Sequence, residues 1–190
     1  MSIKYTMLKN KNLKALDDFK LINEALAGNM NAFGDIVNKY ESMVAKIIIP
    51  MLGNSYDADD IGQETFIRLY KSLDKFKGES QLGTYLARIA INLSLNEIKK
   101  RSQHRNLTLD NNNELPNVEN ERSKDITDMV NSSLEALDPK FRSVIVLRHI
   151  QGFSTKETAT ILNLPLGTVL SRLSRGQNKL KKIITNQTTI

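Results

Sequence analysis

The chain has 190 residues, of which 40% are apolar and 25% are charged, and its formal net charge is +6. It contains no cysteine, which excludes disulfides and thiolate zinc sites and is compatible with a reducing, cytoplasmic setting. The N-terminus is polar, and the longest apolar run, residues 47–52, is far too short to span a bilayer, so we expect neither a signal peptide nor membrane insertion.

The charges are unevenly distributed along the chain. Residues 81–105 carry five basic and one acidic residue, and residues 139–190 carry nine and one. Between these two basic blocks, residues 106–138 carry two basic and eight acidic residues. Two separate basic blocks suggest two contacts along one polyanion.

The N-terminal part of the chain has a helical pattern. Residues 1–16 are weakly patterned and are expected to form a loose tail. A helix is predicted from Asp17 to Gly28, and another over residues 32–48, with a break from Pro50 to Asn54. The next helix, over residues 57–73, has acidic residues at its start and basic residues at its end, an order that complements the helix dipole. Asp57, Asp59 and Asp60 lack the glycine and the downstream ligands of a calcium loop, so we expect no metal and no cofactor.

A glycine-containing loop over residues 77–83 precedes a helix that runs into a basic end. Tyr85 near its start and basic residues along it are typical of a surface that binds single-stranded nucleic acid, with bases stacked on the ring and phosphates on the cations. The alternative is that Tyr85 belongs to the core and that the basic run is a solvated helix end. The residues alone leave both interpretations open.

Residues 105–125 are rich in Asn and Glu and poor in apolar residues, which predicts a flexible acidic linker. Apolar periodicity resumes at Ile126. Asp138 followed by Pro139 predicts a helix start, and Gly152 marks the end of that helix. No strand-like alternation occurs. The sequence therefore predicts an all-α protein of two helical domains, over residues 17–104 and 126–184, joined by the linker.

The strongest pattern lies in residues 154–182. Ser154 and Glu157 form a capping box that predicts a helix start, Asn163 suits a left-handed helix end, and Pro165 suits the opening of a second helix. The second helix has an apolar face and a polar, basic face. This is the pattern of a helix-turn-helix, whose second helix reads the DNA major groove. The alternative is an ordinary amphipathic helix pair with a solvated charged face.

Two segments together resemble the extracytoplasmic-function (ECF) sigma factors of bacterial RNA polymerase. The first includes Asp57-Ala-Asp-Asp-Ile-Gly-Gln-Glu-Thr-Phe66 and Thr84-Tyr-Leu-Ala-Arg-Ile-Ala-Ile-Asn-Leu93, and it is similar to sigma region 2. The second includes Pro165-Leu-Gly-Thr-Val-Leu-Ser-Arg172 and is similar to sigma region 4. The resemblance implies a sigma factor that binds core RNA polymerase, at its β′ clamp and β flap, and directs it to promoter DNA. It implies no catalysis and no small-molecule substrate. Many relatives are held by an anti-sigma protein, although no residue here demonstrates one.

The resemblance also implies roles for individual residues. The resemblance assigns contacts with the −35 promoter element to five residues of the recognition helix: Thr168, Ser171, Arg172, Arg175 and Lys179. It assigns contacts with the −10 element, where the DNA strands separate, to Tyr85, Arg88, Asn92, Lys99, Lys100 and Arg101. It assigns binding to the polymerase to Asp57, Asp60, Gln63 and Glu64.

The sequence departs from the family pattern at several positions. Leu82, Gly83 and Tyr85 stand where the family usually has Phe, Arg and Trp, which leaves fewer rings and charges near the −10 loop. Leu170 replaces a usual Lys and removes a phosphate contact. Gly176 replaces a usual Ala and is expected to soften the recognition helix.

The main alternative function is a stand-alone helix-turn-helix regulator that acts as a dimer. Such a protein needs a ligand pocket or a self-complementary face, and neither is evident in the sequence. An enzyme is disfavoured, because the chain has no phosphate-cradling glycine loop and its two histidines have no evident nucleophile beside them.

Overall fold

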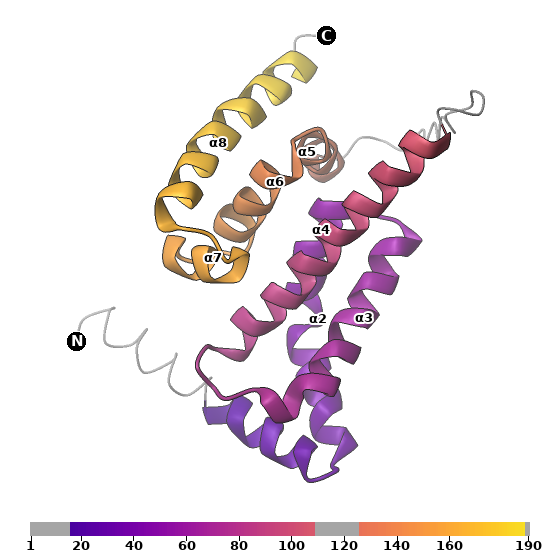
Figure 1. Cartoon of the computed structure of the whole chain (residues 1–190), viewed down its shortest axis with the longest axis vertical. Coiled ribbons are helices and arrows are strands. Elements are labelled where there is room, and N and C mark those ends of the chain that lie inside the picture. The colour runs from indigo at the N-terminus through magenta and orange to yellow at the C-terminus, as the bar shows by residue number, and fades with distance from the viewer. Residues whose placement is uncertain (1–15, 109–125, 189–190) are drawn as a thin grey trace.

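The computed structural model describes residues 16–108 and 126–188, and within these ranges it consists of helices and contains no strand (Figure 1). A helical segment over residues 16–26 comes first. The elements that follow are α2 (Met30–Leu52), α3 (Tyr56–Ser72), the short helix η1 (Leu73–Lys75), α4 (Leu82–Thr108), α5 (Ile126–Glu135), α6 (Pro139–Ile145), the π-turn η2 (Val146–Ile150), α7 (Thr155–Leu162) and α8 (Leu166–Thr188). The all-α prediction is confirmed. The predicted N-terminal tail and most of the predicted linker lie outside the described residues, whereas residues 105–108 belong to α4.

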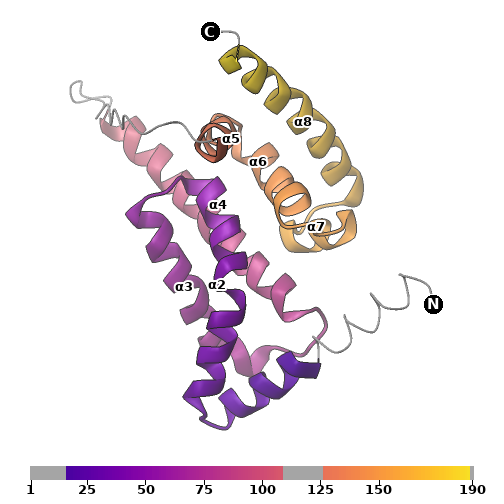
Figure 2. The ribbon, with the colours of Figure 1, turned by 180° about the vertical axis from the view of Figure 1, so that it is seen from behind.

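The helices form two groups. Residues 16–26 with α2, α3 and α4 make an N-terminal domain, in which α2, α3 and α4 pack against one another. Helices α5 to α8 make a C-terminal domain, in which α8 packs across α6, α5 and α7 (Figures 1 and 2). Asp18 fastens the first segment to α2, since its buried carboxylate accepts hydrogen bonds from Lys39 Nζ and Tyr40 Oη, each at 2.7 Å.

The predicted break at Pro50 is wrong. Helix α2 continues through Pro50 to Leu52, and Gly53 ends it with a φ of +79° while its N–H donates to the Ile49 carbonyl at 2.8 Å. A proline in a helix interior costs about 3 kcal/mol. Here Pro50, Met51 and Leu52 are all buried, and full burial of a large aliphatic side chain contributes about 1.5–3 kcal/mol. The apolar contacts therefore outweigh the local cost of the proline.

The C-terminal end of α2 is held by an arginine from α4. Arg101 donates to the Leu52 carbonyl at 3.1 Å and to Asp57 Oδ2 at 2.6 Å, and its Nε lies 3.5 Å from Glu97 Oε1. The last carbonyls of a helix have no partner within the helix, and the helix dipole makes this end negative. Arg101 thus joins the end of α2, the start of α3 and the body of α4.

The two domains share one apolar core. Val146 and Leu147 of η2 and Ile161 of α7 are buried in the same cluster as Ile47 and Met51 of α2. A smaller cluster, centred on Leu134, Leu137 and Ile145, lies within the C-terminal domain and packs against α8. In the described parts of the chain, the domain junction is therefore a packed interior and not a loose contact.

The Arg101 contacts give a testable expectation for stability. Arg101→Ala removes a partly buried, charge-assisted network and should lower the free energy of unfolding by about 1–3 kcal/mol. Lys100→Ala is the matched control, because its exposed pair with Glu97 spans 3.8 Å, and loss of such a pair should change stability by less than about 0.5 kcal/mol. Urea unfolding followed by circular dichroism measures both. Equal losses in the two variants would contradict the assignment.

Candidate functional site

The helix-turn-helix forms as the sequence predicts. Ser154 Oγ accepts from the Glu157 N–H at 3.1 Å, and Glu157 Oε2 accepts from the Ser154 N–H at 2.8 Å, which confirms the capping box at the start of α7. Asn163 ends α7 in the left-handed conformation, with φ 51° and ψ 50°. The chain then turns through Pro165 into α8. The turn geometry fixes the direction in which α8 leaves α7.

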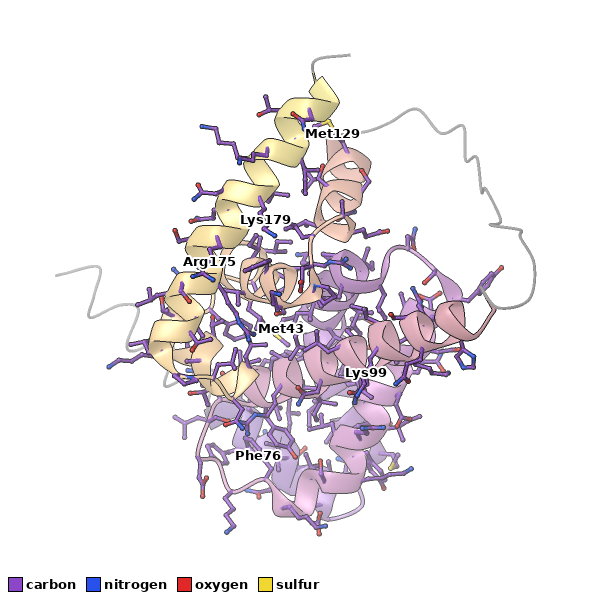
Figure 3. All side chains as sticks on the ribbon, turned by 45° about the horizontal axis from the view of Figure 1, so that its top comes forward. Met43, Phe76, Lys99, Met129, Arg175 and Lys179 are labelled. Atoms are coloured by element: carbon purple, nitrogen blue, oxygen red, sulfur yellow. The ribbon has the colours of Figure 1, made fainter. Side chains whose placement is uncertain are left out.

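The five residues predicted to read the −35 element lie along one side of α8. At 3.6 residues per turn they fall within an arc of roughly 100°, which we call the α8 stripe: Thr168, Ser171, Arg172, Arg175 and Lys179. Ser171, Arg175 and Lys179 are exposed, whereas Thr168 and Arg172 are half-buried. Figure 3 shows Arg175 and Lys179 along this helix. Lys179 Nζ lies 4.9 Å from the centre of the Phe141 ring, a cation–π distance.

Gly176 lies on the buried side of α8, where it crosses α6. A Cβ at this position would lie 3.2 Å from Phe141 Cβ and 3.1 Å from Ile145 Cδ1. The absence of a side chain therefore lets the two helices approach closely. We expected Gly176 only to soften α8. The close approach at Gly176 was missed, although an apolar face interrupted by a single glycine was its signal.

Four of the residues predicted to contact the −10 element lie along one side of α4. Tyr85, Arg88, Asn92 and Lys99 fall within roughly 60° of one another, and we call them the α4 stripe. Arg88, Asn92 and Lys99 are exposed, and Figure 3 shows Lys99 toward the far end of α4. These side chains present a row of hydrogen-bonding and positive groups.

Tyr85 belongs in part to the core and in part to the surface. Its ring is half-buried against the core and lies 5.3 Å, centre to centre, from that of Phe76. Its hydroxyl donates to Ser72 Oγ at 3.0 Å. The ring is thus held in place by the N-terminal domain and keeps part of its surface exposed.

Lys100 and Arg101 do not belong to the α4 stripe. Lys100 is about 90° away from its centre, and Arg101 is on the opposite side of the helix, where it binds the end of α2. The helical register explains this difference, because consecutive residues of a basic run point in different directions.

Arg142 of α6 is a buried residue that no sequence pattern indicated. It is 7% exposed, and its guanidinium donates to the carbonyls of Met51, Glu135 and Leu137. Burial lowers the pKa of Arg142 from its ordinary value, and the nearby charges of Glu135 and Asp138 act in the opposite direction. The guanidinium stays charged near neutral pH because its ordinary pKa is so high. Nothing in the sequence distinguishes this arginine from an exposed one.

The residues predicted to bind the polymerase lie on α3. Asp57, Asp60 and Gln63 are exposed, and half-buried Glu64 pairs with Arg68 at 2.7 Å. Beside them, a groove of about 440 Å³ runs between α2 and α3, and its lining includes Val37, Val44, Ile48, Ala58, Gln63 and Phe66. Asp59 and Glu41 also line it. An acidic helix face thus borders an apolar groove.

Two further properties concern the described residues only. No group of three or more His, Asp or Glu residues there is arranged to hold a metal ion. No helix there is long and apolar enough to cross a membrane.

Comparisons with known proteins identify the family to which the two helical domains belong. The family model for sigma-70 region 2 matches residues 36–104, and that for sigma-70 region 4 matches residues 127–180. The chain is 34% identical to the ECF RNA polymerase sigma factor SigW of Bacillus subtilis over 176 residues, which cover 86% of this chain and 94% of that protein. It is 31% identical to the ECF RNA polymerase sigma-E factor of Escherichia coli K12 over 186 residues, covering 89% and 97%.

The fold is also similar to that of a solved structure, CnrH in complex with the cytosolic domain of CnrY. The TM-score is 0.68 at 28% identity, with 90% of this chain and 98% of that chain covered. A second, at 23% identity and a TM-score of 0.67, is the sigma factor RpoE of Bartonella quintana in complex with the anti-sigma factor NepR, covering 80% and 96%. By its sequence matches over nearly the whole length of its relatives, the chain belongs to the ECF family of RNA polymerase sigma factors.

Proposed function

We propose that this sigma factor binds core RNA polymerase through α3 and the adjoining groove, and directs it to promoters that it reads with the α4 and α8 stripes. The observation that carries the proposal is that the side chains predicted to bind DNA align along one side of each helix, on two different domains. Each stripe is short enough to lie in a DNA groove or along a single DNA strand. Each stripe also lies in one of the two basic blocks of the sequence. The chain performs no chemical step itself in this proposal.

The α8 stripe suits the major groove of the −35 element. An α-helix fits this groove, and arginine can bind guanine through two parallel hydrogen bonds. Arg172 and Arg175 are the candidates for such contacts. Thr168 and Ser171 lie nearer the start of the helix, which is the end that normally enters the groove. Lys179 lies about two turns beyond Ser171 and is suited to bind a phosphate of the DNA backbone.

The α4 stripe suits the −10 element, where the strands separate. The ring of Tyr85 is held in place by its contacts with Phe76 and Ser72. An unpaired base can therefore stack on this ring with little loss of side-chain conformational entropy. Extrusion of a base costs a few kcal/mol, which contacts to the base and backbone must supply. Arg88, Asn92 and Lys99 lie along the same side of α4, where they can bind the backbone of the separated DNA strand. We assign Lys100 to nearby phosphates and Arg101 mainly to the end of α2, because Arg101 is already bound within the protein.

The polymerase surface in this proposal is the acidic face of α3 together with the apolar groove beside it. The groove accepts apolar side chains from the β′ clamp, and Asp60, Gln63 and Glu64 pair with polar or basic groups at its rim. Asp57 contributes less, because Arg101 already holds it.

The C-terminal domain is assigned to the β flap, and we place the assembly in the cytoplasm. An anti-sigma protein is a further proposed partner, and the similar protein CnrH was likewise solved in complex with a domain of another protein, CnrY.

The proposal as a whole is tested by run-off transcription across genomic fragments. The purified protein alone should bind promoter duplex weakly, and its addition to core polymerase should yield discrete, promoter-specific transcripts. Strong, salt-resistant binding of the isolated protein to palindromic sites, with no transcripts, would instead support a stand-alone helix-turn-helix regulator.

Arg172→Ala should weaken recognition of the −35 element by about 1–3 kcal/mol if the guanidinium binds a base through two hydrogen bonds. The loss should be confined to particular bases, and promoter variants assayed with reconstituted holoenzyme measure it. Lys181→Ala removes the same charge from the same helix, at an exposed position on the side of α8 away from the stripe, and should lower affinity slightly and equally for all sequences. An unchanged base preference in Arg172→Ala would refute the assignment.

Asp60→Lys should weaken binding to core polymerase about tenfold or more, because it places a positive charge on the face that meets a basic surface. Asp35→Lys is the control, since Asp35 is exposed on α2 and lies about 200° around that helix from Val37 of the groove. Binding to immobilised core enzyme measures both, with circular dichroism to verify folding. A similar loss in the two variants, or an unfolded Asp60→Lys protein, would remove Asp60 from the interface.

A further inference from the structure

The helical segment over residues 16–26 carries an aromatic ring on its outer side. Ile22 and Ala25 of this segment are buried in the apolar core, whereas Phe19 is 44% exposed and lies outside that core. A single exposed apolar side chain is ordinary on a protein surface. Any role of Phe19 therefore depends on what its ring contacts.

The Phe19 ring lies directly on Gly78, in the loop between η1 and α4. Figures 1 and 2 show this loop beside the first helical segment. A Cβ at Gly78 would lie 2.8 Å from Phe19 Cε1 and nearer still to Cζ, so only a residue without a side chain lets the ring approach this closely. Gly78 also has a φ of +72°, which glycine adopts without steric cost. The loop therefore bends at Gly78 and is covered there by a ring from a distant part of the chain.

Asp18 fixes the direction of the Phe19 ring. Asp18 is 5% exposed, and its carboxylate accepts hydrogen bonds from Lys39 Nζ and Tyr40 Oη of α2. Burial raises the pKa of Tyr40, and the hydrogen bond to Asp18 raises it further, so the hydroxyl remains a donor near neutral pH. Successive residues of a helix point about 100° apart. With Asp18 held on α2, Phe19 is therefore directed toward the loop.

Tyr40 supports the other end of the same loop. A Cβ at Gly83 would lie 3.2 Å from Tyr40 Cε1, so the bare backbone at Gly83 lets the start of α4 pack closely on the ring. The loop is thus held near both ends, by Phe19 at Gly78 and by Tyr40 at Gly83. Asp18 connects the two supports, because it precedes Phe19 in the chain and binds the Tyr40 hydroxyl.

Between these supports the loop adjoins Tyr85 and presents side chains outward. Alternate positions of the loop are exposed: Lys77, Glu79 and Gln81. The Phe76 ring, at the start of the loop, lies 5.3 Å from that of Tyr85. The Tyr85 N–H donates to the Gln81 carbonyl, at the end of the loop, at 3.1 Å. The exposed side chains therefore lie beside the ring on which the proposed function stacks an unpaired base.

We propose that Phe19 is a positioning residue for recognition of the −10 element, because its ring holds the loop so that Glu79 and Gln81 face the separated strand beside Tyr85. The inference rests on the proposed function. A carboxylate can accept a hydrogen bond from the amino group of cytosine, and a side-chain amide can pair with adenine. A loop that is already held in one shape loses little conformational entropy on binding. Phe19 itself touches no DNA in this proposal.

Base preference on a promoter library, transcribed with reconstituted holoenzyme, tests the proposal. Phe19→Ala should reduce discrimination among bases at the −10 positions about fivefold or more, the smallest effect expected for one well-placed base contact. Preference at the −35 positions and affinity for core polymerase should not change. Leu26→Ala is the matched control, because it removes an apolar side chain of similar exposure, 50%, from the end of the same segment, and it should leave both preferences unchanged. Circular dichroism verifies that the variants are folded.

A second substitution tests the contact itself. Gly78→Ala places a methyl group where the Phe19 ring lies, and it should also reduce discrimination at the −10 positions. Because both substitutions remove the same contact, the double variant should lose no more discrimination than the worse of the two single variants. Losses that multiply in the double variant would show that the two residues act independently and would overturn the assigned contact.

The order of the loop in the free protein separates this inference from the proposed function. Nitrogen-15 relaxation should give order parameters of about 0.85 for residues 77–81, and Phe19→Ala should lower them to about 0.6 or less. Leu26→Ala should leave them unchanged. Unchanged order parameters in Phe19→Ala would overturn the support of the loop.

The remaining outcomes concern recognition of DNA. Lower order parameters in Phe19→Ala with full discrimination at the −10 positions would overturn the role of Phe19 in reading. Equal losses at the −10 and −35 positions would show a general loss of folding and would overturn it as well. If the unsubstituted protein yields no promoter-specific transcripts, the proposed function fails, and the order parameters still decide whether Phe19 holds the loop.

Discussion

The last turn of α2 presents carbonyl oxygens that no amide of its own helix can reach, and two arginines bind them from different directions. Arg101 reaches the Leu52 carbonyl from α4, and Arg142 reaches the Met51 carbonyl from α6. The first contact holds the three long helices of the N-terminal domain together, and the second attaches the C-terminal domain to the same point. Because a buried guanidinium is costly unless its hydrogen bonds are made, the position of α6 depends on the end of α2 being where it is.

Beneath these polar contacts lies a continuous apolar interior. Val146, Leu147 and Ile161 come from the C-terminal domain and are each buried to within 1% of full coverage. Full burial of such a side chain contributes about 1.5–3 kcal/mol, so separation of the domains exposes surface at a considerable cost. In the proposed function, contacts with polymerase and DNA would have to supply that free energy in any step that separates the domains.

The features that the sequence predicted well are those decided by neighbouring residues. The capping box of Ser154 and Glu157, the proline start at Pro139 and the left-handed Asn163 each depend on a few adjacent positions, and each is present. The helical register also indicated correctly that the α8 stripe shares one side of its helix. What each stripe touches in DNA stays a prediction.

The features that the sequence did not reveal depend on distant residues. Pro50 remains helical because the interior around it is apolar, and Arg142 is buried because its three acceptors converge from α2, from the end of α5 and from the turn before α6. Arg101 was assigned to DNA with its basic neighbours, although its position on the helix directs it inward. The contact between Arg88 and Thr160 joins residues 72 positions apart, and no local pattern indicates it.

The bare backbone at Gly176 makes the angle of α8 sensitive to a single methyl group. An added carbon there meets Phe141 Cβ and Ile145 Cδ1 at 3.2 and 3.1 Å, so these neighbours must yield by a few tenths of an ångström or α8 must pivot. Helix α8 is roughly 35 Å long, and a small pivot near its middle is magnified at both tips. If the α8 stripe reads DNA as proposed, a substitution at this buried site would change which base pairs the arginines meet while leaving every side chain of the stripe intact. In the proposed function, promoter preference can therefore change through packing as well as through the DNA-reading surface.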